Sequence, residues 1–173
     1  MTLIGRSRAA TSPEARFRDL FATNYPDIFG YAARRVGRDD AADVAADVFT
    51  IAWRSLHRVP DEPESRPWLF GVARNVVSNH LRSLRRHDRL TARAASAEPS
   101  PVQPDLERHD DVTDALRSLG EDDQEILRLA AWEGLEPREI AVVLGCSSNA
   151  AAVRLHRARA RLADAYESRG GRS

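Results

Sequence analysis

The chain has 173 residues, enough for one domain or two small ones, and its hydrophobic content of 42% favours a folded protein. Its formal net charge is zero, which excludes the gross basic excess of a simple nucleic-acid coat protein. The single cysteine, Cys146, excludes an intramolecular disulfide framework and fits a reducing compartment. Because no window approaches a membrane span and no signal peptide is evident, we expect a cytoplasmic protein.

Charge is distributed in blocks of opposite sign. Seven arginines and one aspartate lie between Arg66 and Arg93, a net charge of +6. Ten acids and two arginines lie between Glu98 and Glu125, a net charge of −8. Blocks of opposite charge predict that the protein has at least two binding surfaces, each suited to a different kind of partner. All 26 basic residues are arginine, which suits phosphate contacts, although GC-rich coding accounts for this as well.

The first elements in the chain are predicted helices rich in aromatic residues. Aromatic side chains recur every four residues from Phe17 to Phe29, a spacing typical of a helix core. Pro26 interrupts this row, so we expect one helix ending near Ala22 and a second over residues 26–36.

A third helix is predicted from Asp39 to Leu56, with a broad apolar face. Asp40, Asp43 and Asp47 are spaced so that their carboxylates share one stripe of this helix. The stripe is either an ordinary solvated acidic face or a docking surface for a basic partner, and these residues alone favour the solvated face.

Residues 58–66 contain two prolines and three acids, which predicts a loop, and Pro67 suits the start of the next helix. Besides its apolar face, this helix from Trp68 to Arg86 carries amides, a serine and arginines, namely Arg74, Asn75, Ser78, Asn79, Arg82, Arg85 and Arg86. An aromatic side chain beside arginines and amides suits single-stranded nucleic acid. A core tryptophan beside solvated arginines is an equally good interpretation.

The domain organisation follows from a change in composition. Residues 88–105 are rich in Ala, Arg, Ser and Pro and have almost nothing to bury, which predicts a flexible linker. It separates a helical domain over residues 11–87 from a smaller one over residues 106–167. No strand alternation occurs, so the predicted fold class is all-α, in two small domains.

The segment from Pro137 to Leu162 has the pattern of a helix-turn-helix. Pro137 suits a first helical turn, Gly145 suits a left-handed helix end, and Ser147 or Ser148 can cap the second helix. Four arginines lie off its apolar stripe, at Arg154, Arg157, Arg159 and Arg161. The pattern favours a DNA reader over an ordinary helical hairpin with a basic face.

The sequence offers no catalytic or metal site. Its five histidines are scattered without paired spacing, and there is only one cysteine, so we expect no bound metal. No glycine-rich phosphate loop or G-x-S-x-G motif occurs. We therefore expect a protein without cofactors that is not an enzyme.

In order and spacing, these pieces resemble the extracytoplasmic-function sigma factors of bacterial RNA polymerase. The resemblance spans residues 15–165 and rests on FRDLFATNYPDIFGYAARRV, DDAADVAADVFTIAWR, RPWLFGVARNVVSNHLRSLRR, the proline-rich linker and the helix-turn-helix. It implies a sigma-2-like domain tethered flexibly to a sigma-4-like domain. It also implies core polymerase and promoter DNA, duplex and melted, as partners, and an anti-sigma factor as regulator.

The resemblance also assigns roles to residues. It implies that core polymerase is bound through Asp40, Asp43, Asp47 and Trp53. The melted minus-ten element is expected to be bound by Arg58, Arg66, Trp68, Arg74, Asn75, Asn79 and Arg82. The minus-thirty-five element is expected to be bound by Ser148, Asn149, Ala152, Val153, Arg154, His156 and Arg157.

The chain departs from the family pattern at three of these positions. Asn79 stands where many members have aspartate. Ala152 and Val153 stand where many have a basic and a small polar residue, so we expect contacts to thymine methyl groups there or none.

Two other functions stay open at this point. The chain could be a stand-alone helix-turn-helix repressor that its N-terminal helices dimerise, or a helical adaptor that does not bind DNA.

Overall fold

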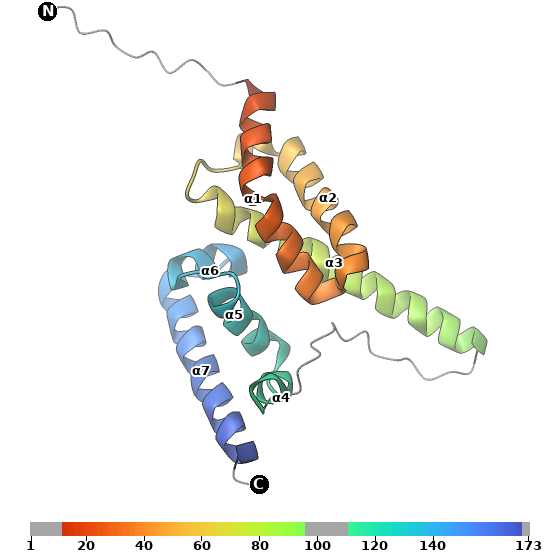
Figure 1. Ribbon diagram of the computed structural model, residues 1–173, viewed down its shortest axis with the longest axis vertical. Coiled ribbons are helices and arrows are strands. Elements are labelled where there is room, and N and C mark those ends of the chain that lie inside the picture. Colours follow the sequence, from red (N-terminus) through yellow and green to blue (C-terminus); the bar gives the residue numbers. More distant parts are fainter. Residues whose placement is uncertain (1–11, 96–110, 171–173) are drawn as a thin grey trace, which may run out of the picture.

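A computed structural model describes residues 12–95 and 111–170, and nearly all of this part of the chain is helical. The N-terminal unit comprises α1 (Pro13–Val36), α2 (Arg38–Arg54), the short 3-10 helix η1 (Leu56–Arg58) and α3 (Ser65–Ala95). The C-terminal unit comprises α4 (Asp111–Ser118), α5 (Glu121–Ala131), α6 (Pro137–Leu144) and α7 (Ser148–Gly170). Figure 1 shows the two units, with α6 beside the first turns of α3 and the end of α3 projecting from its bundle. The predicted all-α fold is confirmed.

Helix α1 is continuous, whereas the sequence predicted two helices. Pro26 lies inside α1 on its exposed side, where a proline removes one backbone hydrogen bond and costs about 3 kcal/mol. The aromatic row continues across it, because the Tyr25 ring lies 6.0 Å from that of Phe29 and 6.1 Å from that of Phe49 on α2. Packing of this row against α2 keeps the two halves of α1 in line.

Helix α3 is longer at both ends than the sequence predicted. It begins at Ser65, two residues before Pro67, and it continues to Ala95, into the range 88–105 that was predicted to be linker. Residues 88–95 consist of Asp, Arg, Leu, Thr and Ala, and the next proline is Pro99, so no breaker ends the helix earlier. Residues 96–105 of the predicted linker lie outside the described residues.

The helix-turn-helix forms from strong local signals. Pro137 is the first residue of α6, and the backbone N–H of Glu136 donates to Oε2 of Glu139 at 2.8 Å in a capping box. Gly145 ends α6 with a positive φ of 63°, which glycine adopts without steric cost. The Ser147 hydroxyl accepts a bond from the N–H of Ala150 at 3.2 Å and caps α7.

The two units pack against each other. Buried apolar side chains of both units belong to one contiguous core cluster. One place where their backbones lie close together is Gly71 of α3, where an added Cβ atom would lie 3.7 Å from the Cα of Val143 on α6. An added Cβ atom would be in ordinary van der Waals contact there, so a small residue suits this position, whereas a larger side chain would meet the backbone of α6.

Candidate polymerase and promoter interfaces

The acidic stripe of α2 is accessible along most of its length. Asp43 and Asp47 are exposed, on the side of α2 opposite its buried residues. Asp40, at the start of the stripe, instead faces α3, where its Oδ2 lies 3.0 Å from Nε2 of His80. Asp43 and Asp47 are therefore the two members of the stripe that are best placed to meet a basic partner.

Trp53 lies at the other end of α2, beside the aromatic row of α1. Its side chain is 44% exposed, and its ring meets that of Phe17 edge-on with 5.1 Å between centroids. Phe21 is also exposed and packs against Phe49. The result is an open aromatic surface near the acidic stripe, of a composition common at the centres of protein interfaces.

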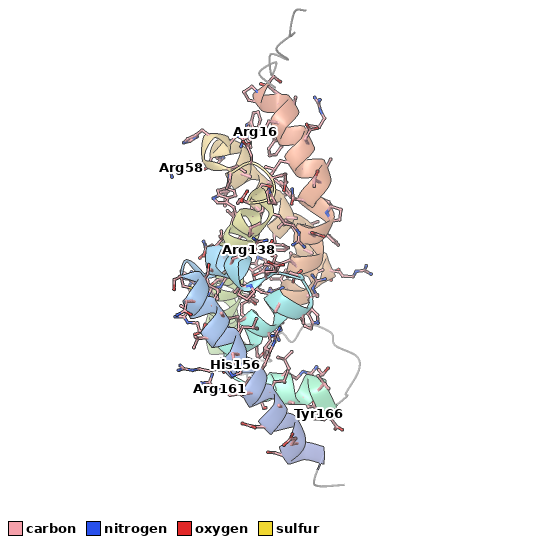
Figure 2. The ribbon with its side chains drawn as sticks, turned by 90° about the vertical axis from the view of Figure 1, so that its left-hand side faces the viewer. Arg16, Arg58, Arg138, His156, Arg161 and Tyr166 are labelled. Atoms are coloured by element: carbon pink, nitrogen blue, oxygen red, sulfur yellow. The ribbon has the colours of Figure 1, made fainter. Side chains whose placement is uncertain are left out.

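Arg16 of α1 organises the segment that joins α2 to α3. Its Nη1 donates to the carbonyl oxygen of Leu56 at 2.8 Å, and its Nη2 donates to the carbonyl oxygen of Val59 at 2.5 Å and to Oδ1 of Asp61 at 3.1 Å. The planar guanidinium suits several such bonds at once. Arg58 is exposed in this segment, and Figure 2 shows it near Arg16 at the end of the molecule away from α7.

Four of the predicted minus-ten residues share one stripe of α3. Trp68, Asn75, Asn79 and Arg82 follow one another at spacings of seven, four and three, which places them on one helix face. Asn75, Asn79 and Arg82 are exposed, while Trp68 is partly buried and packs against the core. Nη2 of Arg82 donates to Oδ1 of Asn79 at 3.0 Å, so this amide is already oriented within the stripe.

The structure sets Arg66 and Arg74 apart from that stripe. Nε of Arg66 donates to Oδ2 of Asp27 at 2.8 Å, and its Nη2 donates to the main-chain oxygen of Glu133 in the C-terminal unit at 2.9 Å. Its guanidinium also lies 5.0 Å from the centroid of the Phe70 ring. Arg74 lies two helical turns further along and is partly buried. Arg66 is thus held between the two units.

All seven predicted minus-thirty-five residues are exposed on the first turns of α7, namely Ser148, Asn149, Ala152, Val153, Arg154, His156 and Arg157. The opposite face of α7 buries Ala151, Leu155 and Ala158 in the core. Arg161 lies beyond this group and pairs with Asp123 of α5 at 2.7 Å. In Figure 2 His156 and Arg161 follow each other along α7.

A cluster of charged and polar side chains joins the two units, and we call it the interface cluster: Tyr31, Arg34, Arg35, Glu125 and Glu133. Arg35 donates to both carboxylates, with Nε 3.1 Å from Oε2 of Glu125 and Nη1 3.1 Å from Oε1 of Glu133. The Tyr31 hydroxyl donates to Oε1 of Glu125 at 2.9 Å, and Arg34 pairs with Oε2 of Glu133. Arg35 and Glu133 are each less than 10% exposed.

Burial and charge shift the pKa values in this cluster. Burial, reinforced by the Glu125 carboxylate, raises the pKa of the Tyr31 phenol well above its usual value, so the phenol stays protonated. Burial disfavours the charged form of Arg35, but the Glu125 and Glu133 carboxylates outweigh this effect and raise its pKa. Outside the cluster, burial and the charge of the nearby Arg35 lower the pKa of Arg128 on α5. The cluster therefore contains a charged arginine beside its acids and a neutral phenol.

Two features of these surfaces were not predicted from the sequence. Arg16 donates hydrogen bonds to a segment that lies 40 or more residues away in the sequence. Glu125 and Glu133 accept hydrogen bonds from an arginine that lies 90 or more residues away. Helical periodicity marks which residues share a face, but it does not say which distant element covers that face. Glu133 lies in the segment between α5 and α6, and nothing in the neighbouring sequence predicted that it would bind arginines of α1.

Among the residues that the structure describes, no group of three or more histidine, cysteine, aspartate or glutamate side chains could hold a metal ion. In the same part of the chain no helix is both long and apolar enough to cross a membrane.

Comparison with known proteins identifies the family. The Sigma-70 region 2 family matches residues 20–87, and the family described as Sigma-70, region 4 matches residues 109–162. The RNA polymerase sigma factor CarQ of Myxococcus xanthus is 38% identical over 149 residues, which cover 82% of this chain and 83% of CarQ. The ECF RNA polymerase sigma factor SigL of Mycobacterium tuberculosis is 29% identical over 157 residues, which cover 87% and 88%.

Solved structures agree with this result. CnrH in complex with the cytosolic domain of CnrY has a TM-score of 0.61 and 30% identity, covering 92% of each chain. The sigma factor RpoE in complex with the anti-sigma factor NepR from Bartonella quintana also has a TM-score of 0.61, covering 88% of this chain and 97% of RpoE. At 22% identity, this second likeness concerns the fold alone.

The two matching regions define a sigma factor of the sigma-70 type. The chain belongs to the extracytoplasmic-function sigma factors of bacterial RNA polymerase, as the sequence predicted. It binds core RNA polymerase and promoter DNA and directs the initiation of transcription, and it is not an enzyme. Family membership decides against the stand-alone repressor and the helical adaptor.

Proposed function

We propose that three surfaces of the chain divide the work of a sigma factor. The stripe of Asp43 and Asp47, with Asp40 and Trp53 at its ends, docks on core polymerase. The segment around Arg58 and the polar stripe of α3 bind the melted minus-ten strand, and the exposed face of α7 binds the minus-thirty-five duplex. The first two surfaces lie in the proposed domain of residues 11–87, whose last helix α3 continues to Ala95, and the third lies in the proposed domain of residues 106–167.

The observation that carries this proposal is the chemistry of the α3 stripe. An indole at its start, two amides and an arginine follow one another on one face, with Asn75, Asn79 and Arg82 exposed. Single-stranded nucleic acid is bound by aromatic and arginine side chains that stack on bases, together with charge along the backbone. A base captured in this way offsets part of the cost of unstacking, about a few kcal/mol. Opening of the duplex is thereby favoured.

Arg16 stabilises the conformation of the segment that carries Arg58, which is part of the proposed minus-ten surface. Its bonds to the backbone at Leu56 and Val59 hold the segment that carries Arg58. Arg16 is partly buried, whereas Arg58 is exposed, and Figure 2 shows the two near each other. We assign it as a positioning residue for the minus-ten surface.

On α7, base readout rests on few side chains. Ala152 and Val153 are exposed but have no hydrogen-bonding side chain, so they can contribute only apolar contact, such as contact with a thymine methyl group. Asn149, Arg154, His156 and Arg157 supply the polar and charged contacts. Much of the promoter discrimination then falls on α3 and the segment before it.

An anti-sigma factor is proposed as the regulator, and the cytoplasm as the location. Support comes from the structural neighbours, of which RpoE is in complex with an anti-sigma factor and CnrH with the cytosolic domain of CnrY. A pull-down of the tagged chain from its own cells, followed by identification of the captured proteins, tests this part. Capture of core polymerase subunits alone would contradict it.

Run-off transcription tests the central proposal. Purified core polymerase is combined with genomic promoter fragments, with and without this chain. Transcripts that require the chain are expected, and they should weaken when Asn75 and Arg82 are replaced together by alanine. Exposed Glu167 on α7, replaced by alanine, is the control and should leave transcription unchanged. If the Asn75 and Arg82 replacements change nothing, the minus-ten assignment fails.

A further inference from the structure

We propose that Asn79 and Arg82 act as one unit that selects a keto base, guanine or thymine, over an amino base, adenine or cytosine, at one position of the melted minus-ten strand. The inference rests on the minus-ten assignment of the preceding subsection. It goes beyond that assignment because it names the chemical class of base that this part of α3 accepts and the contact that decides the choice.

The first observation is the orientation of the Asn79 amide. Nη2 of Arg82 donates to Oδ1 of Asn79 at 3.0 Å. A guanidinium group has only donors, so the oxygen of the amide, and not its NH2 group, must face Arg82. The contact therefore fixes which way round the amide lies. Its oxygen is engaged, and its NH2 group, which carries two donors, is directed away from Arg82.

The second observation is what holds Arg82 beside Asn79. Nε of Arg82 donates to the main-chain oxygen of Ser78 at 3.3 Å, and its Nη2 lies 3.4 Å from Oγ of the same serine. These bonds direct the guanidinium back over the preceding turn of α3. Asn79 and Arg82 are both exposed, so a base can approach them. The two side chains offer that base a cation and amide donors on one surface.

The third observation is the contrast between the two amides of the α3 stripe. Asn75 and Asn79 lie one helical turn apart, about 6 Å along the axis, so a strand that follows the stripe meets both. Within residues 12–95 and 111–170 the Asn75 side chain has no hydrogen-bond partner, so its amide can turn either way. The amide of Asn79 is held by Arg82. Asn79 is therefore the amide with a defined preference.

The chemistry of the bases turns this orientation into a choice. Guanine presents the acceptors O6 and N7 and thymine presents O4, whereas adenine and cytosine present the amino donors N6 and N4. The NH2 group of Asn79 and the guanidinium of Arg82 both donate, so they bond a keto oxygen. An amino group would place a donor against donors beside a cation. An asparagine with a free oxygen can bond adenine through both of its groups, but the oxygen of Asn79 already accepts from Arg82.

The test measures binding of single-stranded DNA by the full chain in complex with core polymerase. The probe is the labelled non-template strand of a promoter fragment that gives a transcript with this chain. Each position of the minus-ten element carries in turn hypoxanthine or adenine, and uracil or cytosine, so that ring size is constant within each keto and amino pair. At one position, the keto base of the better-bound pair should bind at least about fivefold more tightly than its amino counterpart. The absence of any such position would overturn the proposal.

Asn79→Asp is the decisive variant. It keeps the shape of the side chain, but a carboxylate only accepts hydrogen bonds, so the preference at that position should reverse in favour of the amino base. Asn75→Asp is the matched control, because it makes the same change at the other exposed amide of the stripe. The control should keep the keto preference at the Asn79 position. If Asn79→Asp weakens the binding of all probes equally, the added charge alone accounts for the effect and the proposal is overturned.

Arg82→Ala tests the part played by the arginine. Without Arg82 the amide of Asn79 is free to turn, so keto and amino bases should bind about equally at that position. A keto preference that survives Arg82→Ala would overturn the proposal. The proposed function fails separately, if replacing Asn75 and Arg82 together by alanine leaves transcription unchanged. If that double replacement weakens transcription but Asn79→Asp leaves the base preference as in the wild type, this inference alone fails.

Discussion

Arg35 of α1 and Glu133 of the segment before α6 form an ion pair across the two helical units. Nη1 and Oε1 are 3.1 Å apart, and the side chains are 5% and 3% exposed, although 98 residues separate them in the sequence. A charge so deeply buried is tolerated only when it is paired and hydrogen-bonded. This pair adds a buried, directional contact between charged groups to the apolar packing of the two units.

Replacement of Arg35 by alanine should therefore destabilise the chain strongly. The change leaves the acids of the interface cluster without their main partner, and breaking a buried pair in this way costs about 3–5 kcal/mol. Urea denaturation followed by circular dichroism measures the loss. Arg138→Ala, which removes an exposed pair with Glu136, is the control and should alter stability little. A similar small change for Arg35→Ala would show that the cluster contributes little to folding.

Stability should also depend on pH through Tyr31. Its pKa is raised in the folded state, so the unfolded chain loses this proton first as pH rises above the usual tyrosine value of about 10. The folded state then binds more protons than the unfolded state, and stability falls with increasing pH. The contribution of Tyr31 to the free energy of unfolding is complete below about pH 10 and is lost as the pH rises towards the pKa of Tyr31 in the folded state.

Urea denaturation between pH 8.5 and 11 tests whether the free energy of unfolding falls as the pH rises. Tyr31→Phe removes the titrating group and should flatten the decline, at the cost of the bond to Glu125. Tyr166→Phe, at an exposed position on α7, should keep the decline of the wild type. If Tyr31→Phe and the wild type decline in parallel, Tyr31 is not the source of the effect.

A structural feature of this protein could be predicted from the sequence when residues close together in the chain determine it. The turn of the helix-turn-helix was predicted correctly, because Pro137, Gly145 and Ser147 act within a few residues. The break at Pro26 was wrong, because packing of the aromatic row against α2 outweighs the local effect of proline. The exposed residues of α7 follow from helical periodicity, whereas the contact of Gly71 with Val143 joins distant elements and left no periodic signal.

Charge reversal on α2 should weaken the binding of core polymerase. Asp43→Arg with Asp47→Arg replaces two exposed acids by arginines, and the fold should be retained because neither side chain is buried. Like charges placed opposite a basic partner lower the association rate and the affinity, by about tenfold or more for two reversals. Titration of labelled chain with core polymerase measures this. Asp164→Arg with Glu167→Arg makes the same change of charge on α7 and should bind as the wild type does; equal affinity of both variants would remove the stripe from the docking surface.

Replacement of Arg16 should affect the minus-ten surface selectively. Arg16→Ala removes bonds to the backbone at Leu56 and Val59, each with a charged donor and worth about 1.5–3 kcal/mol. We expect fewer open complexes, measured as permanganate reactivity of unpaired thymines, with little change in duplex binding by α7. Arg16→Lys keeps the charge but not the planar fork, so it should restore the signal only in part. If duplex binding and opening fall together, the effect is a general loss of folding.

Arg157→Ala should weaken the binding of duplex DNA and reduce the dependence of the affinity on salt concentration. Arg157 is exposed on α7 and is expected to neutralise a phosphate, so its loss should lower affinity about equally for all sequences. The slope of log affinity against log salt concentration should decrease in magnitude by about 1, because one fewer counterion is released. Fluorescence anisotropy with a promoter duplex at several salt concentrations measures both quantities. Arg161→Ala is the matched control, since Arg161 pairs with Asp123 and lies beyond the predicted contact group. An unchanged slope for Arg157→Ala, or an equal change for both variants, would mean that α7 does not contact DNA through Arg157 in the way its position indicates.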